Sequence, residues 1–488
     1  MQRDKSLVLK KLINTGMGNI KDVLTAGNEY GGVSPWMPQD NYKFKIDEEY
    51  ILNNNLNKPS SFLIRLEEKI RINKLYIRFS RSSPKFRSLG GFIYRSLIYL
   101  TKLVDRLYWL HICNRKWVPL ESLKEYSAKN RIVKIVVCNQ LTVSTPKPKT
   151  LPAGGGGMLT QSKENYSSNS IYIAKIDNAL IHSGSNIVFT RESAIYHDLI
   201  NLENDLIPEE YSGLCEIDLS KKSLKWKMMG AGKILTIPIA ASFTDHCSSN
   251  YAHWLTEVLP RIAVFCEQDQ FQHIPLIVDY LPHPNLVESL AAVSKGRKIY
   301  FAAKNKHFLV RSLYLTSVSG YVPFGRRNQG NSSLNGGSFN PYAFTLLRTV
   351  LSDEAAKLPK VNYPKKIYVR RKRRCNKRIK NGAELESALH EKGFVTVVTE
   401  DLNFLQQVIL FSNAERVVCS SGSALSNLIF TDSKCDIRVP IIKHCSANYS
   451  YWNNMACACG NSVSYIFGDE DLTSLDVHSN FSFDINLL

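Results

Sequence analysis

Apolar and polar positions follow one another in a regular pattern from about residue 170 onward. Short apolar runs such as "IYIAKI", "NIVFT", "IPLIVDY", "KIYFA" and "SLYLTSV" have the length and the β-branched content of strands. Residues 251–265 and 285–293 instead place apolar side chains at helical spacing. This order of segments predicts a layered sheet that is covered by helices.

A second region repeats the alternation after a polar loop over residues 323–341. Its predicted strands are "KIYVRRK", "FVTVV", "RVVCS" and "IRVPII", and its predicted helices are "AELESALHEKG", "FLQQVILFS" and "SALSNLIF". Four strands that alternate with three helices are typical of a doubly wound parallel sheet, which places its ligands at the carboxyl ends of its strands.

Composition fits a protein of more than one domain. The chain has 488 residues, which is too long for one ordinary core. Hydrophobic residues make up 44% and charged residues 22%, as in folded globular proteins. The net charge of +19 favours an anionic partner, and nucleic acid, a sugar nucleotide and an acidic membrane surface all satisfy it.

The 11 cysteines are scattered and include no CxxC pair. This usage favours reduced thiols in a cytosolic compartment over a disulfide framework. A metal site built from Cys457, Cys459 and His444 is disfavoured, because zinc modules show tighter and repeated spacing.

Residues 1–143 form a basic region that we expect to be rich in helices. The amino-terminal residues lack the apolar core of a secretory signal. The longest apolar candidate, residues 88–112, is interrupted by four charged residues, which a membrane span rarely tolerates. It fits a basic amphipathic helix on an anionic membrane, or a helix packed on the core with a solvated basic face, and the second is favoured. Residues 144–157 have the proline and glycine content of a linker.

Small residues follow the strand "RVVCS" and lead directly into a predicted helix. Ser421, Gly422 and Ser423 let a ligand approach the backbone, and a helix start offers free N–H groups to an anion. Arg370 and Arg371 leave the neighbouring strand. In a parallel sheet both loops share one edge, where guanidinium groups and backbone donors suit a diphosphate. The alternative is a solvated basic surface or a nonspecific nucleic-acid patch.

The segment "NYAHWLTEVLPR" carries the candidate acid–base residues. His253 and Glu257 are four residues apart and share one helix face. A carboxylate that orients an imidazole suits general-base catalysis, although an ion pair on the helix surface is the commoner arrangement at this spacing. Pro260 predicts a helix end or a kink, after which Arg261 leaves that face.

Two other acidic segments are weaker candidates. Asp245 and His246 lie just upstream of this helix in a predicted loop. Residues 468–472, "GDEDL", contain the Asp-x-Asp arrangement of many metal-dependent glycosyltransferases. They follow the last predicted strand, so we interpret them as a solvated turn.

These segments together resemble glycosyltransferase family 61. "NYAHWLTEVLPRI" is similar to that family's N(Y/F)xHWxxExLPR segment, and residues 367–430 are similar to its carboxyl-terminal signature. Many members have a histidine before the glycine of the turn and a second glycine two residues later, where this chain has Ser421 and Ala424. The other matching positions are Arg370, Arg371, Arg378, Asn381, Glu384, Gly393, Phe394, Phe404, Gln407, Gly422, Leu425, Asn427 and Phe430.

The resemblance implies a GT-B-like α/β architecture, with two Rossmann-like doubly wound domains that face a cleft. We expect an acceptor domain over residues 144–330 and a donor domain over residues 331–488. The implied reaction is inverting transfer from a nucleotide sugar, commonly a UDP-sugar, without an obligatory metal or other cofactor. The candidate catalytic residues are His253, Glu257 and Asp245, and the candidate donor-binding residues are Arg370, Arg371, Arg378, Ser421, Gly422, Ser423 and Asn427.

The expected acceptor is a glycan or a lipid-linked saccharide in bacterial surface polysaccharide synthesis. The basic amino-terminal region favours a cytoplasmic protein at the inner face of the plasma membrane. Two alternatives stay open: a noncatalytic assembly partner with the same fold, and a nucleic-acid-binding protein. The second is disfavoured because basic and aromatic residues show no interleaved recognition pattern.

Overall fold

A computed structural model describes most of the chain after residue 116. The described residues are 117–152, 164–190, 192–200, 202, 215–226, 235–281, 283–303, 306–322, 337–372, 379–443, 449–470 and 480–488. The predicted amphipathic helix at residues 88–112, Arg378 and His444 lie outside them. No helix in these ranges is both long enough and apolar enough to cross a bilayer.

The first sheet is mixed and contains eleven strands in the part of the chain that the structure describes. Strands β13, β12, β11 and β14 are parallel neighbours, and β6 runs antiparallel to β14. Its strands are β1 (Val118–Ser122), β2 (Lys134–Cys138), β6 (Ile171–His182), β7 (Val188–Phe189), β8 (Ala194–Tyr196), β9 (Cys215–Asp218), β10 (Ser223–Trp226), β11 (Leu235–Ser242), β12 (Leu276–Asp279), β13 (Ile299–Ala302) and β14 (His307–Thr316). The parallel part carries the predicted alternation of strands and helices.

The second sheet is largely parallel, in the order β18-β17-β19-β20-β21, and β22 pairs antiparallel with β21. Its strands are β4 (Lys149–Leu151), β17 (Lys366–Val369), β18 (Val395–Val397), β19 (Arg416–Cys419), β20 (Asp436–Ile442), β21 (Ser464–Glu470) and β22 (Phe481–Ser482). Two small two-stranded sheets pair β3 (Thr142–Ser144) with β5 (Asn165–Ser167) and β15 (Gly320–Tyr321) with β16 (Ser338–Phe339). The predicted doubly wound order of strands and helices is therefore present.

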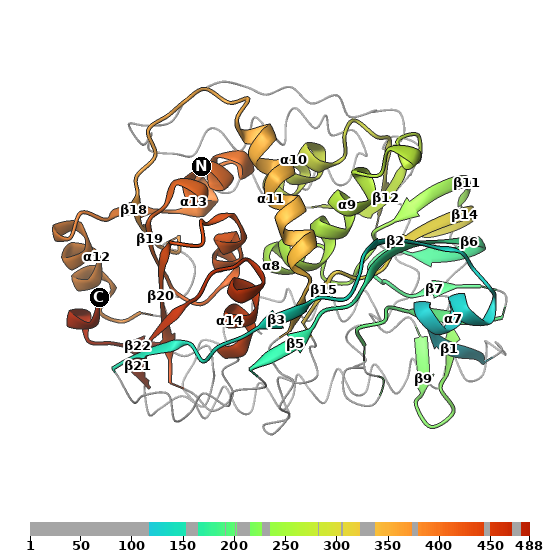
Figure 1. Cartoon of the computed structure of the whole chain (residues 1–488), viewed down its shortest axis with the longest axis horizontal. Helices are drawn as coiled ribbons and strands as arrows, with labels where there is room; N and C mark the ends of the chain where they lie inside the picture. Colours follow the sequence, from blue (N-terminus) through green and yellow to red (C-terminus); the bar gives the residue numbers. More distant parts are fainter. Residues whose placement is uncertain are drawn as a thin grey trace, which may run out of the picture.

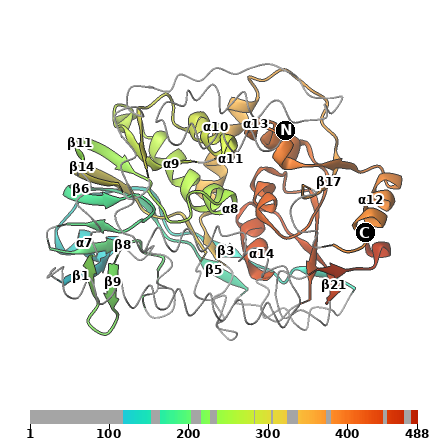
Figure 2. The ribbon, with the colours of Figure 1, turned by 180° about the vertical axis from the view of Figure 1, so that it is seen from behind.

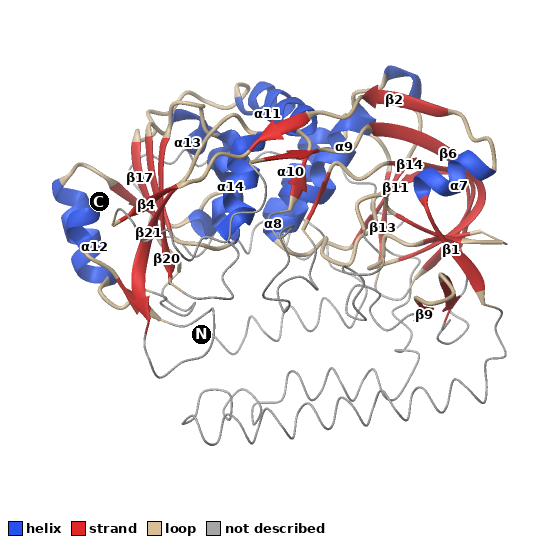
Figure 3. Ribbon diagram, turned by 60° about the horizontal axis from the view of Figure 1, so that its bottom comes forward, coloured by secondary structure: helices blue, strands red, loops and turns tan. Residues whose placement is uncertain are grey.

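Most helices lie between the two sheets, while α12 covers the outer face of the second sheet (Figure 1). The view from behind and the view from below show the same layers (Figures 2 and 3). The helical segments are α7 (Leu123–Lys129), α8 (Tyr251–His253), η3 (Trp254–Val258), α9 (Leu259–Cys266), η4 (Asp269–Phe271), α10 (Pro284–Val293), α11 (Pro341–Ala355), α12 (Gly382–Glu391), η6 (Thr399–Asp401), α13 (Phe404–Asn413), η7 (Ser423–Phe430), α14 (Tyr449–Ala458) and η8 (Ile485–Leu487).

One continuous hydrophobic core joins the two halves. It takes Trp254 and Leu276 from the first half, Leu347 and Leu351 from α11, and Val417 from the second sheet. Helix α11 packs against both α9 and α13, so apolar side chains fill the layer between the sheets. The continuous core fixes the position of the helix that carries His253 relative to the second sheet.

Three sequence predictions need correction. The predicted linker over residues 144–157 contains β4, which pairs in parallel with β21 because backbone groups of an exposed strand can accept another strand. Residues 468–470 are not a turn but the end of β21, which pairs antiparallel with β22. Residues 118–138, which we grouped with the helix-rich region, form β1, α7 and β2, and both strands join the first sheet.

Candidate active site

His253 and Glu257 form a buried pair on the helix that runs through α8, η3 and α9. The His253 Nδ1 and Glu257 Oε1 atoms are 2.5 Å apart, and the side chains are 5% and 9% exposed. The alternative of an ion pair on the helix surface is therefore wrong. A carboxylate that accepts from Nδ1–H places the lone pair of the neutral imidazole on Nε2, as a general base requires.

The helix continues past Pro260, contrary to the predicted end or kink. Residues Trp254–Val258 form a π turn in which the Leu259 N–H donates to the Trp254 carbonyl, and this wider turn accommodates the proline that follows. Proline has no N–H for the Thr256 carbonyl four residues earlier. The backbone of Gly320 in β15 packs on that carbonyl, where a Cβ atom would collide with it.

A polar network beneath the helix fixes its position. Arg261 donates from Nη2 to Asp245 Oδ2 at 3.1 Å and from Nε to the Glu257 carbonyl at 2.9 Å. The Asp279 carboxylate, at the end of β12, accepts from the Asp245 backbone N–H at 2.7 Å and from the Ser248 hydroxyl at 3.0 Å. Asp245 therefore binds the arginine of the same helix that carries the His253–Glu257 pair.

The two aspartates of this network have opposite pKa shifts. Burial raises the pKa of Asp279 to about 7, against the effect of its hydrogen-bond donors. Burial acts in the same direction on Asp245, but His246 and Arg261 outweigh it and hold the pKa of Asp245 below its ordinary value. Asp245 is consequently the stable anion that faces Arg261.

Arg371 meets the glycine turn at the carboxyl ends of β17 and β19. These strands are parallel and pair Val369 with Cys419, so the loops that follow share one edge, as expected. Arg371 Nη2 donates to the Ser421 carbonyl at 2.5 Å. Its guanidinium occupies the space that a Cβ atom on residue 422 would fill, which explains why Gly422 fits here. The edge thus holds a cation directly beside a helix start.

Arg370 lies elsewhere. Its Nη1 atom is 3.1 and 3.2 Å from the carboxylate oxygens of Glu386 on α12. Successive residues of an extended strand point to opposite faces, so Arg370 follows Tyr368 toward α12 and Arg371 follows Val369 toward the central layer. Of the predicted donor-binding arginines that the structure describes, Arg371 is the one that meets the turn.

The serines of the turn are engaged in different ways. Ser421 Oγ accepts from the indole N–H of Trp452 in α14 at 3.1 Å. Ser423 is exposed and begins η7, which is a 3-10 helix. Its carbonyl accepts from the Ser426 hydroxyl at 2.7 Å. The predicted helix is present and has the tighter 3-10 geometry.

A tyrosine joins the two parts of the site. The hydroxyl of Tyr251 in α8 lies 2.8 Å from Asn427 Oδ1 and 3.1 Å from Gln407 Oε1. Asn427 Nδ2 donates to Gln407 Oε1 at 2.9 Å, and Gln407 Nε2 donates to the Thr399 carbonyl at 3.0 Å. We call Tyr251, Gln407 and Asn427 the tyrosine–amide triangle. It connects the helix of His253 to the 3-10 helix that follows Gly422.

A comparison with known families identifies this region. Residues 251–438 match the family model described as Glycosyltransferase 61. The chain carries a domain of glycosyltransferase family 61. The resemblance drawn from the sequence is thereby confirmed, and with it glycosyltransferase as the activity class, with a sugar donor and an acceptor. No curated protein matches the chain.

The glycosyltransferase 61 domain contains both parts of the candidate site. It begins at Tyr251 and extends to Arg438 in β20, so it includes the His253–Glu257 helix, Arg371 and the Gly422 turn. Asp245 precedes it. The domain thus spans elements from both sheets, and the tyrosine–amide triangle lies within it.

Several residues of this region escaped the site prediction. Tyr251 and Gln407 stand in the motifs that carry the family 61 resemblance, but no spacing rule connects them across 156 positions. Asp279 ends the apolar strand "LIVD", and a carboxylate after a buried strand is the signal that could have marked it. Trp452 lies in a helix beyond the matched domain.

Proposed function

We propose that this protein transfers a sugar, with inversion, from a UDP-sugar to a glycan or lipid-linked saccharide. The observation that carries the proposal is the contact of Arg371 with the Gly422 turn, at the carboxyl edge of a parallel sheet. A guanidinium beside a helix start suits a diphosphate. The second support is that α8 and η3, which hold the His253–Glu257 pair, pack against the 3-10 helix after that turn.

In the proposed GT-B-like arrangement, the second sheet binds the donor. The first N–H groups of η7 lack partners within the helix and would donate to the diphosphate. Arg371 would offset the negative charge that builds on the leaving nucleoside diphosphate, a role that a metal fills in other designs. Gly422 serves by leaving room for the guanidinium. Arg370, paired with Glu386, supports the loop from the other face of the sheet.

The His253–Glu257 pair would act on the acceptor. The acceptor hydroxyl oxygen forms a bond to the anomeric carbon while the bond from that carbon to the phosphate oxygen breaks. The nucleoside diphosphate leaves with the bonding electrons, and the hydroxyl proton passes to His253 Nε2. Glu257 stabilises the imidazolium that results, because its carboxylate is already at Nδ1. Asp245 accepts a hydrogen bond from Arg261 and so helps to position the helix that carries His253 and Glu257.

The setting we propose is bacterial surface polysaccharide synthesis, at the inner face of the plasma membrane. The net charge of +19 supports an acceptor on a lipid diphosphate and a negatively charged membrane surface.

Calorimetry with UDP, GDP, CMP and ADP, each with and without a chelator, tests the proposal. We expect selective UDP binding that the chelator leaves unchanged and that Arg371→Ala weakens about tenfold or more, because a charge-assisted contact is lost. Lys372→Ala is the matched control, since the Lys372 ammonium pairs with Asp401 at 2.6 Å. His253→Ala should keep UDP binding and lose transfer. The absence of binding to all four nucleotides would refute the proposal.

A further inference from the structure

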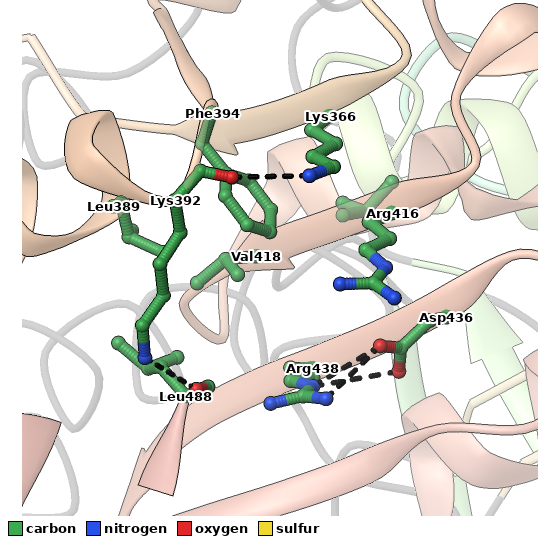
Figure 4. Close-up of a pocket in the computed structure, with 10 residues that line it drawn as sticks. Lys366, Leu389, Lys392, Phe394, Arg416, Val418, Asp436, Arg438 and Leu488 are labelled. Carbon is green, nitrogen blue, oxygen red and sulfur yellow. Dashed lines mark hydrogen bonds and ion pairs between the residues drawn. The ribbon is translucent and has the colours of Figure 1, made fainter. Parts of the chain in front are cut away.

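A second basic site lies at the opposite end of the second sheet from Gly422. A pocket of about 300 Å³ opens at the amino-terminal ends of β17, β19 and β20 (Figure 4). Lys366 and Arg416 are the first residues of β17 and β19, whereas Arg371 and Gly422 follow the last residues of the same strands. The pocket is therefore separate from the candidate active site.

The pairing of the strands explains why cations gather here. Lys366 pairs with Arg416, and Arg416 pairs with Asp436 on the third strand. Arg438 stands two residues after Asp436, so its side chain is on the same face. Arg416 and Arg438 are diagonal neighbours on adjacent strands, and such positions are about 7–8 Å apart, within reach of a shared small anion. Figure 4 shows both side chains extending into the same space.

The charges of the pocket are only partly compensated. Lys366 Nζ donates to the Lys392 carbonyl at 3.1 Å, and Lys392 Nζ donates to the Leu488 main-chain oxygen at 2.7 Å, so neither lysine pairs with an acidic side chain in these contacts. Arg438 pairs with Asp436 at 3.1 Å. Among the described residues, the Arg416 guanidinium makes no hydrogen bond or ion pair, although its charge acts on Glu415 next to it. Four basic side chains thus line the pocket with one acidic side chain, that of Asp436.

Apolar side chains complete the pocket. Leu389 lies in α12, Phe394 immediately precedes β18, and Val418 lies in β19. All three are buried. A ligand that fits must carry an anionic group for the arginines and a compact body that tolerates apolar contact, and small organic phosphates have this composition.

We propose that this pocket binds a phosphate monoester, with Arg416 and Arg438 as its principal ligands. Planar guanidinium groups match phosphate oxygens in pairs. The position of the pocket, on the face of the sheet opposite the central layer, makes it an ancillary site that does not depend on the proposed donor site. The monoester belongs either to a free metabolite or to a lipid headgroup, and both present the same group to the arginines.

Calorimetry at 0.15 M salt tests the site with ribose 5-phosphate, glycerol 3-phosphate and pyrophosphate. The same chain is titrated with phosphatidylcholine vesicles with and without phosphatidic acid. Arg416→Ala should weaken binding about tenfold, and Arg416→Lys should recover part of the loss, because one charge remains without the bidentate geometry. Lys365→Ala is the control. It also removes one positive charge, but Lys365 is exposed beside the pocket and pairs with Glu415 at 2.6 Å, so the change should alter phosphate affinity less than about twofold.

Arg371→Ala separates this site from the donor site. Phosphate binding that is unchanged in Arg371→Ala and about tenfold weaker in Arg416→Ala supports the pocket, whether or not UDP binds the protein. Binding to soluble monoesters identifies a free ligand, and binding only to vesicles with phosphatidic acid identifies a lipid headgroup. The proposal is overturned by the absence of saturable binding, by equal losses in Lys365→Ala and Arg416→Ala, or by a loss confined to Arg371→Ala.

Discussion

Adjacent residues with the same side chain make different contacts in this protein. Arg370 pairs with Glu386 on the outer face of the second sheet, whereas Arg371 reaches the Ser421 carbonyl and the Gly422 turn. The alternation of an extended strand explains the difference, because consecutive side chains point to opposite faces. At the residue scale, position along the strand decides which arginine belongs to the site.

Two glycines of the site make room for very different neighbours. A Cβ atom on Gly320 would collide with the Thr256 carbonyl, which is backbone, whereas one on Gly422 would meet the end of the Arg371 side chain. We expect Gly320→Ala to lower the free energy of unfolding by about 1–3 kcal/mol, as overpacking in a core does. Gly422→Ala should change stability by less than about 1 kcal/mol and weaken UDP binding, because the guanidinium can move.

Urea denaturation and calorimetry on both variants measure these effects. Each variant adds one methyl group, so each is the control for the other. Equal stability losses, or a Gly422→Ala protein with unchanged nucleotide affinity, would contradict the assignment of Arg371 and Gly422 to one site.

The helix of residues 251–266 departs from regular α-helical geometry, and contacts with other elements hold it in place. Its π turn accommodates Pro260, and the released Thr256 carbonyl is covered by β15. Arg261 ties the same helix to Asp245, and Tyr251 ties its first turn to Gln407 and Asn427 on the second half. At the element scale, contacts on either side of the His253–Glu257 pair, through Tyr251 and Arg261, hold the pair in one place.

Tyr251→Phe tests the tyrosine–amide triangle. The change leaves Asn427 Oδ1 without the hydroxyl, and an unsatisfied buried acceptor costs about 1–3 kcal/mol of stability. We expect a lower kcat for sugar transfer, because the helix that carries His253 is held less firmly against the second half. UDP affinity should be nearly unchanged, because Arg371 and the Gly422 turn are not altered. Steady-state kinetics and calorimetry measure the two quantities.

The matched control is Tyr342→Phe, which removes a half-buried phenol hydroxyl from α11 outside the triangle. A Tyr251→Phe protein that behaves like this control would show that the triangle has no positioning role.

The whole molecule is held together by the layer of helices between its sheets. Leu347 of α11 is fully buried in the core that continues from Trp254 to Val417. Because α11 packs on α9 and on α13, the two halves share one hydrophobic core. At this scale, the described residues form one packed unit in which neither sheet has a separate core on its inner face.

Leu347→Ala should therefore weaken both halves. A large-to-small change in a core costs about 2–5 kcal/mol. We expect hydrogen exchange to lose protection equally in β12 and in β19, since one cooperative unit opens as a whole. Exchange measured by mass spectrometry on peptides from both strands checks this. A loss confined to one strand would show that the halves unfold independently.

The sequence determined most of the elements and the family. Apolar periodicity located β6, β12, β13, β14, the helix of residues 251–265 and α10, and also the strands and helices between residues 366 and 442, because burial of one face imposes that period wherever the element lies. It did not predict β11, α11, α14 or β21. It also placed two small-residue and basic loops at strand ends, and a parallel sheet brings such ends together. The burial of the His253–Glu257 pair could not be predicted from the sequence, because the same spacing occurs on the solvated faces of helices.

Only the tertiary structure decided the contacts between distant segments. The pairing of β4 with β21, the burial of His253, the choice of Arg371 over Arg370 and the bonds of Tyr251 to Gln407 and Asn427 all depend on which elements become neighbours. Sequence periodicity records the face that an element buries and carries no record of the element that covers it. The partner is set by packing, because a core selects the arrangement in which side chains from remote positions fill the same space.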